Sequence, residues 1–303
     1  MKIEYIQHNQ INRQKWDSSI TNAQNRLVYA LSWYLDIVSP NWDALIHGDY
    51  EMVMPLTYKK KFGIKILYQP IFAQQLGVFS RNQITTDELE NFIDSISMYF
   101  KFIEINLNSS NKRLNSTNLR LKNTQIVDLS LAYHNIFSNY SNNHKKNLKI
   151  FNKSGFIINN SGSSSDYIFL LQKMYEAKKI FEIKKKDLEG FKKIIDYSLS
   201  KGFSQLFFGY LNNELCAAAF FLKWGNRVIF FSAMNEIGRN ASAMFGIIDN
   251  YIKENAGQDL ILDFAGSNIP GVKYRNLGFG AKNETYFAYK YNNLPIPYKW
   301  FKR

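Results

Sequence analysis

The strongest constraint on the fold lies in residues 204–235, where three apolar runs are separated only by short turns. The runs are SQLFFGYLN, ELCAAAFFLKW and RVIFFSAMN, and the turns are Asn212-Asn213 and Gly225-Asn226. Runs of this length and composition are typical of strands, and such Asn- and Gly-containing pairs are typical of hairpin turns. We therefore predict an antiparallel meander in this region.

The flanking segments predict helices that cover the sheet. Residues 165–179, 187–202 and 241–257 have apolar side chains at helical spacing. In the first half, Thr85 and Glu88 have the spacing of a capping box at the start of a further helix. Strands, helices and a meander in this order predict an α+β fold with mixed central sheets flanked by helices.

The two halves of the chain share this order of elements loosely, which is consistent with a tandem duplication. The polar segment 107–125 is rich in Asn and Ser and is predicted to be a loop near the join. We predict two domains, residues 1–135 and 136–303.

The composition indicates which classes of partner and which cellular compartment to expect. The chain has 38 Lys and Arg residues and 25 Asp and Glu residues. This surplus of positive charge attracts anionic partners such as nucleic acid, nucleotides or a membrane surface. The alternative is an organism whose proteins are generally rich in lysine. Cys216 is the only cysteine and the histidines are scattered, so we expect no disulfide and no metal centre. Without a recognisable signal peptide or membrane-spanning run, we expect a cytoplasmic protein that makes peripheral membrane contact at most.

The segment LDFAGSNIPGVKYRNLGFGAKNE, residues 262–284, carries the most informative motif. The phosphate-loop, dinucleotide and nucleophile-elbow motifs are absent from the sequence. From Asn268 the spacing to Gly271, Tyr274 and the following Leu-Gly-Phe resembles the signature of the GNAT acyltransferase superfamily, with Gly271 in place of alanine. The same letters also suit an ordinary glycine cap at a helix end.

The order of elements upstream adds to this resemblance. In GNAT proteins a strand leads into a helix whose N-terminal amides bind the pyrophosphate of coenzyme A, and VIFFSAMNEIGRNASAMFGII supplies strand, loop and helix here. Such a helix start suits an anion, and strand amides suit the carbonyl of an acyl group. The resemblance assigns donor binding to Phe231, Ser232, Ala233, Met234, Gly238, Arg239, Asn240, Ala241 and Ser242.

The glycine-rich loop that is usual in GNAT proteins is only partly retained in this sequence. FemAB-type transferases, which have two tandem GNAT-like domains and generally use aminoacyl-tRNA, tolerate this loss. The whole chain resembles that branch, best over Ser141–Tyr291 and through segments such as YQPIFAQQLGVFS and HKKNLKIFNKSG. The resemblance implies an acceptor-side first domain and a catalytic second domain.

Tyr274, Asp263 and Asn268 are the main catalytic candidates, and Glu284 is an alternative to Asp263. Tyr274 could protonate the leaving group, although a packing role gives the same sequence. Asp263 and the nearby Glu284 could relay a proton from the attacking amine; the alternatives are a turn cap and a solvated surface charge. Asn268 would lie beside the acyl carbonyl.

Acceptor and donor contacts are also expected outside this motif. The resemblance implies that Trp33, Tyr34, Gln74 and Gln75 line the acceptor cleft, where amides and aromatic faces suit a sugar or peptide. The alternative is core packing for the aromatic residues and a turn for the glutamines. Lys145 and Lys149, with Lys153, fall on one helical stripe that suits phosphates, or is a solvated helix face.

The function that these features imply is transfer of an activated acyl group, from aminoacyl-tRNA, to an amine of a cell-envelope precursor or peptide. No tightly bound cofactor is expected. One alternative is an N-acyltransferase that uses acyl-CoA in surface polysaccharide synthesis. The other is a non-catalytic basic module that binds RNA or an envelope precursor. The amine acceptor of the transferase could be a nucleotide- or lipid-linked envelope precursor.

Overall fold

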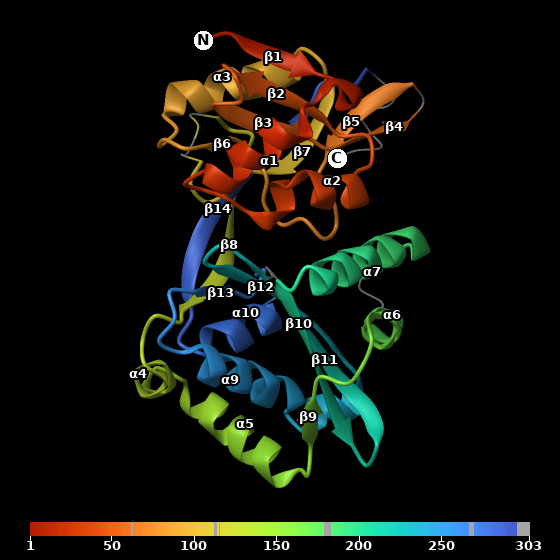
Figure 1. Cartoon of the computed structure of the whole chain (residues 1–303), viewed down its shortest axis with the longest axis vertical. Helices are drawn as coiled ribbons and strands as arrows, with labels where there is room; N and C mark the ends of the chain where they lie inside the picture. The colour runs from red at the N-terminus through yellow and green to blue at the C-terminus, as the bar shows by residue number, and fades with distance from the viewer. Residues whose placement is uncertain (62, 112–113, 115, 179–182, 267–269, 296–303) are drawn as a thin grey trace. The chain divides into compact units, whose positions relative to one another are not determined.

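The structure is a computed structural model, shown in Figure 1, and it describes residues 1–61, 63–111, 114, 116–178, 183–266 and 270–295. The chain divides into two compact units. Unit 1 comprises Met1–Lys122 and Thr285–Arg303, and unit 2 comprises Asn123–Glu284. Helices and mixed sheets in both units confirm the predicted α+β class.

Unit 1 contains two sheets. The antiparallel sheet has the order β1 (Ile3–Ile6), β2 (Asp43–His47), β3 (Met52–Leu56) and β6 (Phe79–Ser80). The mixed sheet has the order β4 (Tyr58–Lys61), β5 (Ile64–Tyr68), β7 (Phe102–Asn106) and β14 (Lys282–Asn292), in which β5 and β7 are parallel.

The helices of unit 1 pack on these sheets, and buried apolar side chains of strands and helix α3 form its core. The helices are η1 (His8–Gln10), α1 (Arg13–Asn22), η2 (Val28–Ala30), α2 (Ser32–Val38) and α3 (Thr86–Ser97). The predicted capping box is present, because the Thr85 side chain accepts from the Glu88 N–H and Glu88 accepts from the Thr85 N–H.

Unit 2 is built on one mixed sheet. Its order is β8 (Leu119–Asp128), β13 (Ile261–Asp263), β12 (Arg227–Met234), β11 (Glu214–Trp224), β10 (Ser204–Leu211) and β9 (Ile157–Asn159). The strands β10, β11 and β12 are the predicted meander. Its first turn has Asn212 and Asn213 at positive φ, 51° and 64°, which is the conformation that a two-residue hairpin turn requires.

Helices lie on both sides of this meander, with α6 and α7 on one side and α5 and α9 on the other (Figure 1). Successive side chains of β11 point to opposite faces, so Phe220 contacts Phe191 of α7 while Phe221 stacks on Tyr251 of α9. The helices are α4 (Tyr133–Ser138), α5 (Asn142–Lys153), α6 (Ser164–Lys178), α7 (Lys185–Ser200), α8 (Glu236–Asn240), α9 (Ala243–Asn255) and α10 (Pro270–Leu277).

The compact units differ from the predicted ranges 1–135 and 136–303 because two strands cross the boundary. The strand β8 starts inside the segment predicted to be a loop and pairs with β13 of unit 2. The strand β14 returns the end of the chain to unit 1, where it pairs with β7. Each unit thus completes its mixed sheet with a strand from the other half of the sequence.

Candidate active site

The parallel strands β12 and β13 part after a short stretch of pairing. Their register runs from Arg227 opposite Ile261 to Ile229 opposite Asp263. Beyond that point β12 continues to Met234 along β11, whereas β13 ends and the chain turns away. Within residues 183–266 and 270–295, no strand therefore lies along the second half of β12 on its β13 side.

Hydrogen bonds at the two ends of β12 show which backbone groups face this opening. The Asn235 N–H donates to the Cys216 carbonyl on β11 over 3.0 Å, and the Asn226 carbonyl accepts from the Ile261 N–H on the other side over 2.7 Å. Backbone groups of successive strand residues point alternately to the two neighbouring strands. Odd-numbered residues of β12 consequently bond to β11, and even-numbered residues face β13 or the opening.

This alternation makes Ser232 the residue of β12 whose backbone is best placed to contact a ligand in the opening. Phe230, Ser232 and Met234 turn their N–H and C=O groups away from β11. Phe230 directly follows the last residue that pairs with β13, so Ser232 is the first of the three that lies clear of that strand. An N–H held by a strand and aimed at an opening can bind an acyl carbonyl and stabilise its oxyanion. Of the residues predicted here, Phe231 and Ala233 instead direct their backbone groups to β11.

The predicted donor loop is folded onto itself. Asn235 caps the short helix α8 by accepting from the Gly238 N–H. The N–H groups of Arg239, Ala241 and Ser242 donate to backbone carbonyls over 3.2, 3.0 and 3.1 Å, respectively. These four amides are thus engaged by the chain itself, whereas free amides at the start of a helix are what binds a pyrophosphate group.

Packing explains why glycine stands at position 238. A Cβ atom there would lie 2.5 Å from the carbonyl oxygen of Cys216, so only glycine lets α8 approach β11 this closely. Ala241 and Ser242 are buried, while Arg239 and Asn240 are exposed. The Ser242 hydroxyl donates to Asn147 Oδ1 of α5 over 2.8 Å.

Asp263 lies at the centre of a buried polar network at the end of β13. Its side chain is 1% exposed and pairs with Arg227 over 2.8 Å. The same carboxylate accepts from the Thr124 hydroxyl and from the Ala265 N–H. The carboxylate thereby fixes the turn after β13, in agreement with the turn-cap interpretation.

Arg227 joins two carboxylates, because it also pairs with Glu284. Burial lowers the pKa of its guanidinium, but the charges of Asp263 and Glu284 outweigh burial and raise the pKa overall. Arg227 therefore stays charged and holds the start of β12 to the end of β13. The sequence interpretation missed Arg227 and Thr124, since neither belongs to the GNAT motif and both lie far from Asp263 in the sequence.

Tyr274 projects from helix α10 and is 63% exposed. A bound ligand or water can therefore reach this side chain, and its catalytic role stays a prediction. Asn268, the third catalytic candidate, lies outside the described residues.

The Leu-Gly-Phe part of the motif has a packing role. A Cβ atom on Gly278 would lie 1.9 Å from the imidazole of His144, so glycine leaves the space that this fully buried ring occupies. The ring donates from Nε2 to the Arg275 carbonyl and packs edge-on against Phe279. Burial lowers the pKa of His144, which keeps the ring neutral.

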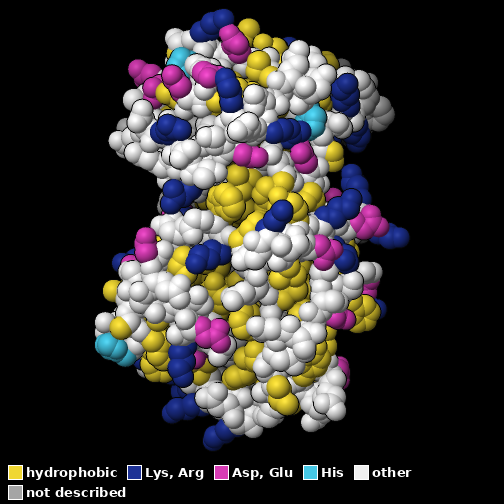
Figure 2. All heavy atoms as spheres, in the orientation of Figure 1, with side chains coloured by type: hydrophobic (Ala, Val, Ile, Leu, Met, Phe, Trp, Pro, Cys, Tyr) yellow, Lys and Arg dark blue, Asp and Glu magenta, His cyan; other side chains and the backbone are white. Residues whose placement is uncertain are grey.

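The predicted phosphate contacts lie on helix α5. Lys145 donates to the Ser138 carbonyl over 3.2 Å and lies over the Phe137 ring, whereas Lys149 is exposed. On the face shown in Figure 2, Lys and Arg side chains are spread among Asp and Glu rather than gathered in one patch. Lys149 is the better placed of the two for an external anion.

The predicted acceptor residues lie in unit 1. Tyr34 is fully buried and donates to the Phe72 carbonyl over 2.6 Å, and Trp33 packs edge-on against it. Gln75 is 1% exposed and accepts from the Ser109 N–H, whereas Gln74 is partly exposed. Tyr34 and Gln75 thus serve the packing of unit 1, and Trp33 and Gln74 keep accessible surface.

Metal-binding and membrane-spanning features are absent from the part of the chain that the structure describes. Its residues form no group of three or more His, Cys, Asp or Glu side chains that could hold a metal ion. None of its helices combines the length and the apolar character needed to cross a bilayer.

Solved structures provide the comparison with known proteins. The chain superposes on FemX with a TM-score of 0.65 and 14% identity, over 100% of both chains. This chain has a tandem GNAT fold. A tandem GNAT protein from the clavulanic acid biosynthesis pathway matches with a TM-score of 0.55 and 9% identity, over 97% of this chain and 99% of that one. An acetyltransferase of the GNAT family from Colwellia psychrerythraea matches with a TM-score of 0.51 and 10% identity, over 96% and 100%.

The predicted fold and the likeness to the FemAB-like branch are thereby confirmed at the level of structure. In sequence, the chain matches no family model and no curated protein.

Proposed function

We propose that the protein is an acyltransferase that moves an aminoacyl group from tRNA to an amine of a peptide or cell-envelope precursor. The observation that carries this proposal is the opening beside β12, where the Ser232 N–H lies beyond the last pair with β13. An acyl carbonyl placed there would accept from this N–H, which would also stabilise the oxyanion formed on attack.

The reaction needs no cofactor. The amine nitrogen attacks the carbonyl carbon of the aminoacyl ester, a new C–N bond forms and the ester C–O bond breaks. The amine loses a proton, and the ribose hydroxyl that leaves takes one up. Tyr274 would supply that proton from its exposed hydroxyl, or solvent would do so in its place.

The closed donor loop favours aminoacyl-tRNA over coenzyme A. The amides of Gly238, Arg239, Ala241 and Ser242 are occupied by the chain's own acceptors. A pyrophosphate group would have to displace these bonds. Phosphates of tRNA could instead pair with surface cations such as Lys149, and the reaction would take place in the cytoplasm, where charged tRNA is made.

A transfer assay tests the proposal. The full chain is incubated with a complete set of tRNAs charged with labelled amino acids, and with nucleotide- or lipid-linked peptide precursors as acceptors. We expect label to appear in the precursor as an amide that is stable to mild base, whereas the starting ester is not.

A parallel arm with labelled acetyl-CoA separates the alternatives. Transfer from acetyl-CoA alone would replace the aminoacyl proposal by the acyl-CoA reaction on an amine of a surface polysaccharide precursor. Tight, salt-sensitive RNA binding without transfer from either donor would favour the non-catalytic module.

A further inference from the structure

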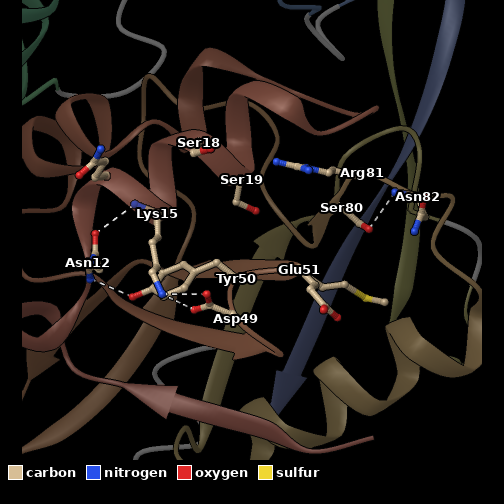
Figure 3. Close-up of a pocket in the computed structure, with 12 residues that line it drawn as sticks. Asn12, Lys15, Ser18, Ser19, Asp49, Tyr50, Glu51, Ser80, Arg81 and Asn82 are labelled. Atoms are coloured by element: carbon tan, nitrogen blue, oxygen red, sulfur yellow. Dashed lines mark hydrogen bonds and ion pairs between the residues drawn. The ribbon is translucent and has the colours of Figure 1, made fainter.

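A cavity lies wholly within unit 1 and is not part of the site described above. Its volume is about 720 Å³, within the range of small-molecule sites. Figure 3 shows that its walls come from helix α1, from the turn between β2 and β3, and from the residues just after β6. Hydroxyl, amide and charged side chains supply most of the labelled lining, so an apolar ligand would not suit it.

Ser19 is the most informative residue of this cavity. It is 6% exposed, its hydroxyl points into the cavity, and it makes no hydrogen bond among the described residues (Figure 3). A helical serine commonly donates to a carbonyl of the preceding turn. The Ser19 hydroxyl therefore keeps its donor available to a group that binds in the cavity.

Arg81 supplies an available positive charge beside Ser19. Its side chain is exposed, extends toward Ser18 and Ser19, and makes no ion pair or hydrogen bond within the part of the chain that the structure describes (Figure 3). The other cation of the cavity, Lys15, is already paired with Asp49 over 2.6 Å. An acidic group between Arg81 and Ser19 would accept from both side chains.

The opposite wall provides acceptors and a fixed aromatic ring. The carboxylate of Glu51 is 71% exposed, and the imidazole Nε2 of His47 lies 4.0 Å from it. Tyr50 has φ +64°, which a bulky side chain seldom adopts, and its hydroxyl is fixed by the Asn12 N–H over 2.8 Å. Carboxylates that accept from hydroxyl groups, beside an aromatic ring, suit a sugar.

We propose that this cavity binds an anionic sugar, meaning a polyhydroxylated ring with one carboxylate or phosphate group. The acid pairs with Arg81 and accepts from the Ser19 hydroxyl, and the ring hydroxyls bond to the carboxylates of the opposite wall. Binding here does not depend on the transfer reaction proposed above.

Calorimetric titration of the full chain tests this site, with glucuronate and glucose 6-phosphate as probes and with glucose and inorganic phosphate as references. We expect at least one anionic sugar to bind at least about tenfold more tightly than either reference, because only it engages both walls. The stronger of the two anionic sugars identifies the acid as carboxylate or phosphate.

Variants distinguish the site from general surface charge. Arg81→Gln should weaken binding by about tenfold or more, and Ser19→Ala by about threefold to tenfold. Arg26→Gln, an exposed arginine of unit 1 outside the cavity, is the matched control and should bind like the parent.

Each other outcome overturns the proposal. Equal binding of phosphate and glucose 6-phosphate would reveal an adventitious ion only, and equal binding of glucose would remove the role of Arg81. Failure of all four probes to bind, or unchanged binding by Arg81→Gln, would equally contradict it.

Discussion

Each unit contains a strand split, meaning two parallel strands that pair over a short stretch and then part. Among the described residues, the space between the parted strands is filled in unit 1 and open in unit 2. In unit 1, β5 and β7 run parallel and pair from Ile66 opposite Phe102 to Tyr68 opposite Glu104. In unit 2, β12 and β13 run parallel and pair over a stretch of the same length. The two units differ in the chain segments that lie beyond the last pair.

In unit 1 the chain itself fills the space beyond the pairing. The Gln69 side chain accepts from the Asn106 N–H over 2.8 Å, and the Asn106 carbonyl accepts from the Leu76 N–H over 2.9 Å. Leu76 then pairs with Leu107 as an isolated bridge. The backbone groups that could have held a ligand therefore serve the fold.

In unit 2, no such segment among the described residues occupies the N–H and C=O groups of β12 beyond its last pair with β13, because Asp263 and Arg227 hold β13 to the start of β12 only. Two units of similar topology can thus divide their tasks. We infer that unit 2 retains the site for an acyl carbonyl and that unit 1 has closed its own.

The largest effect is expected for Asp263→Ala. This change leaves the guanidinium of Arg227, whose side chain is only 15% exposed, with Glu284 as its remaining carboxylate, so the free energy of unfolding should fall by about 3–5 kcal/mol. Asp43→Ala in unit 1 is the matched control. Asp43 is also buried and pairs with Lys65, but the Lys65 side chain is 30% exposed and can turn to water. The control should therefore lose less stability than Asp263→Ala.

Urea denaturation of both variants, followed by hydrogen exchange of β12 and of β2, measures the two effects. Equal losses of stability in the two variants would show that the Arg227–Asp263 pair contributes no more to the free energy of unfolding than the Lys65–Asp43 pair.

The second prediction concerns Ser232→Pro, which removes the N–H that faces the opening but no hydrogen bond to β11. We expect turnover to fall by about 10²–10³-fold, which is typical for loss of an oxyanion donor, while the fold persists. Ser232→Ala keeps the N–H and should retain activity. Ala233→Pro removes an N–H that faces β11 and should instead destabilise the sheet.

Steady-state kinetics combined with thermal unfolding separates these outcomes. Full activity of Ser232→Pro would remove this amide from the mechanism, and equal destabilisation by the two prolines would contradict the assignment of odd and even residues.

A smaller effect is expected for Gln69→Ala in unit 1. The Asn106 N–H loses its acceptor, so the free energy of unfolding should fall by about 1–3 kcal/mol, with turnover of the folded protein unchanged. The measurement is denaturation together with active-site-normalised turnover. A loss of turnover at full stability would mean that the split of unit 1 takes part in the reaction.

Local chemistry made much of this fold predictable from the sequence. The meander depends on turn residues that adopt positive φ, and helix α3 begins at the capping box of Thr85 and Glu88. The exchange of β8 and β14 between the units could not be predicted, because strand pairing depends on contacts between distant segments. The polar composition of residues 107–125 concealed the start of β8.

The site was predictable in part for the same reason. The motif pointed to the segment around Asp263 and Tyr274, but a motif does not show that Gly278 makes room for His144 or that Gly238 approaches Cys216. Arg227 gave no signal, since a single arginine in a strand usually points to solvent. Its burial depends on Asp263, 36 residues away in the sequence.

The smallest effect is expected for Tyr274→Phe. The hydroxyl of Tyr274 is on a side chain that is 63% exposed, so water can replace it as a proton donor, and turnover should fall by no more than about tenfold. Donor binding should stay nearly unchanged, because the aromatic ring is retained. Single-turnover kinetics beside a donor titration measures both quantities. Unchanged turnover would leave solvent as the acid and make the open strand split, rather than any side chain, the feature that distinguishes unit 2 from unit 1.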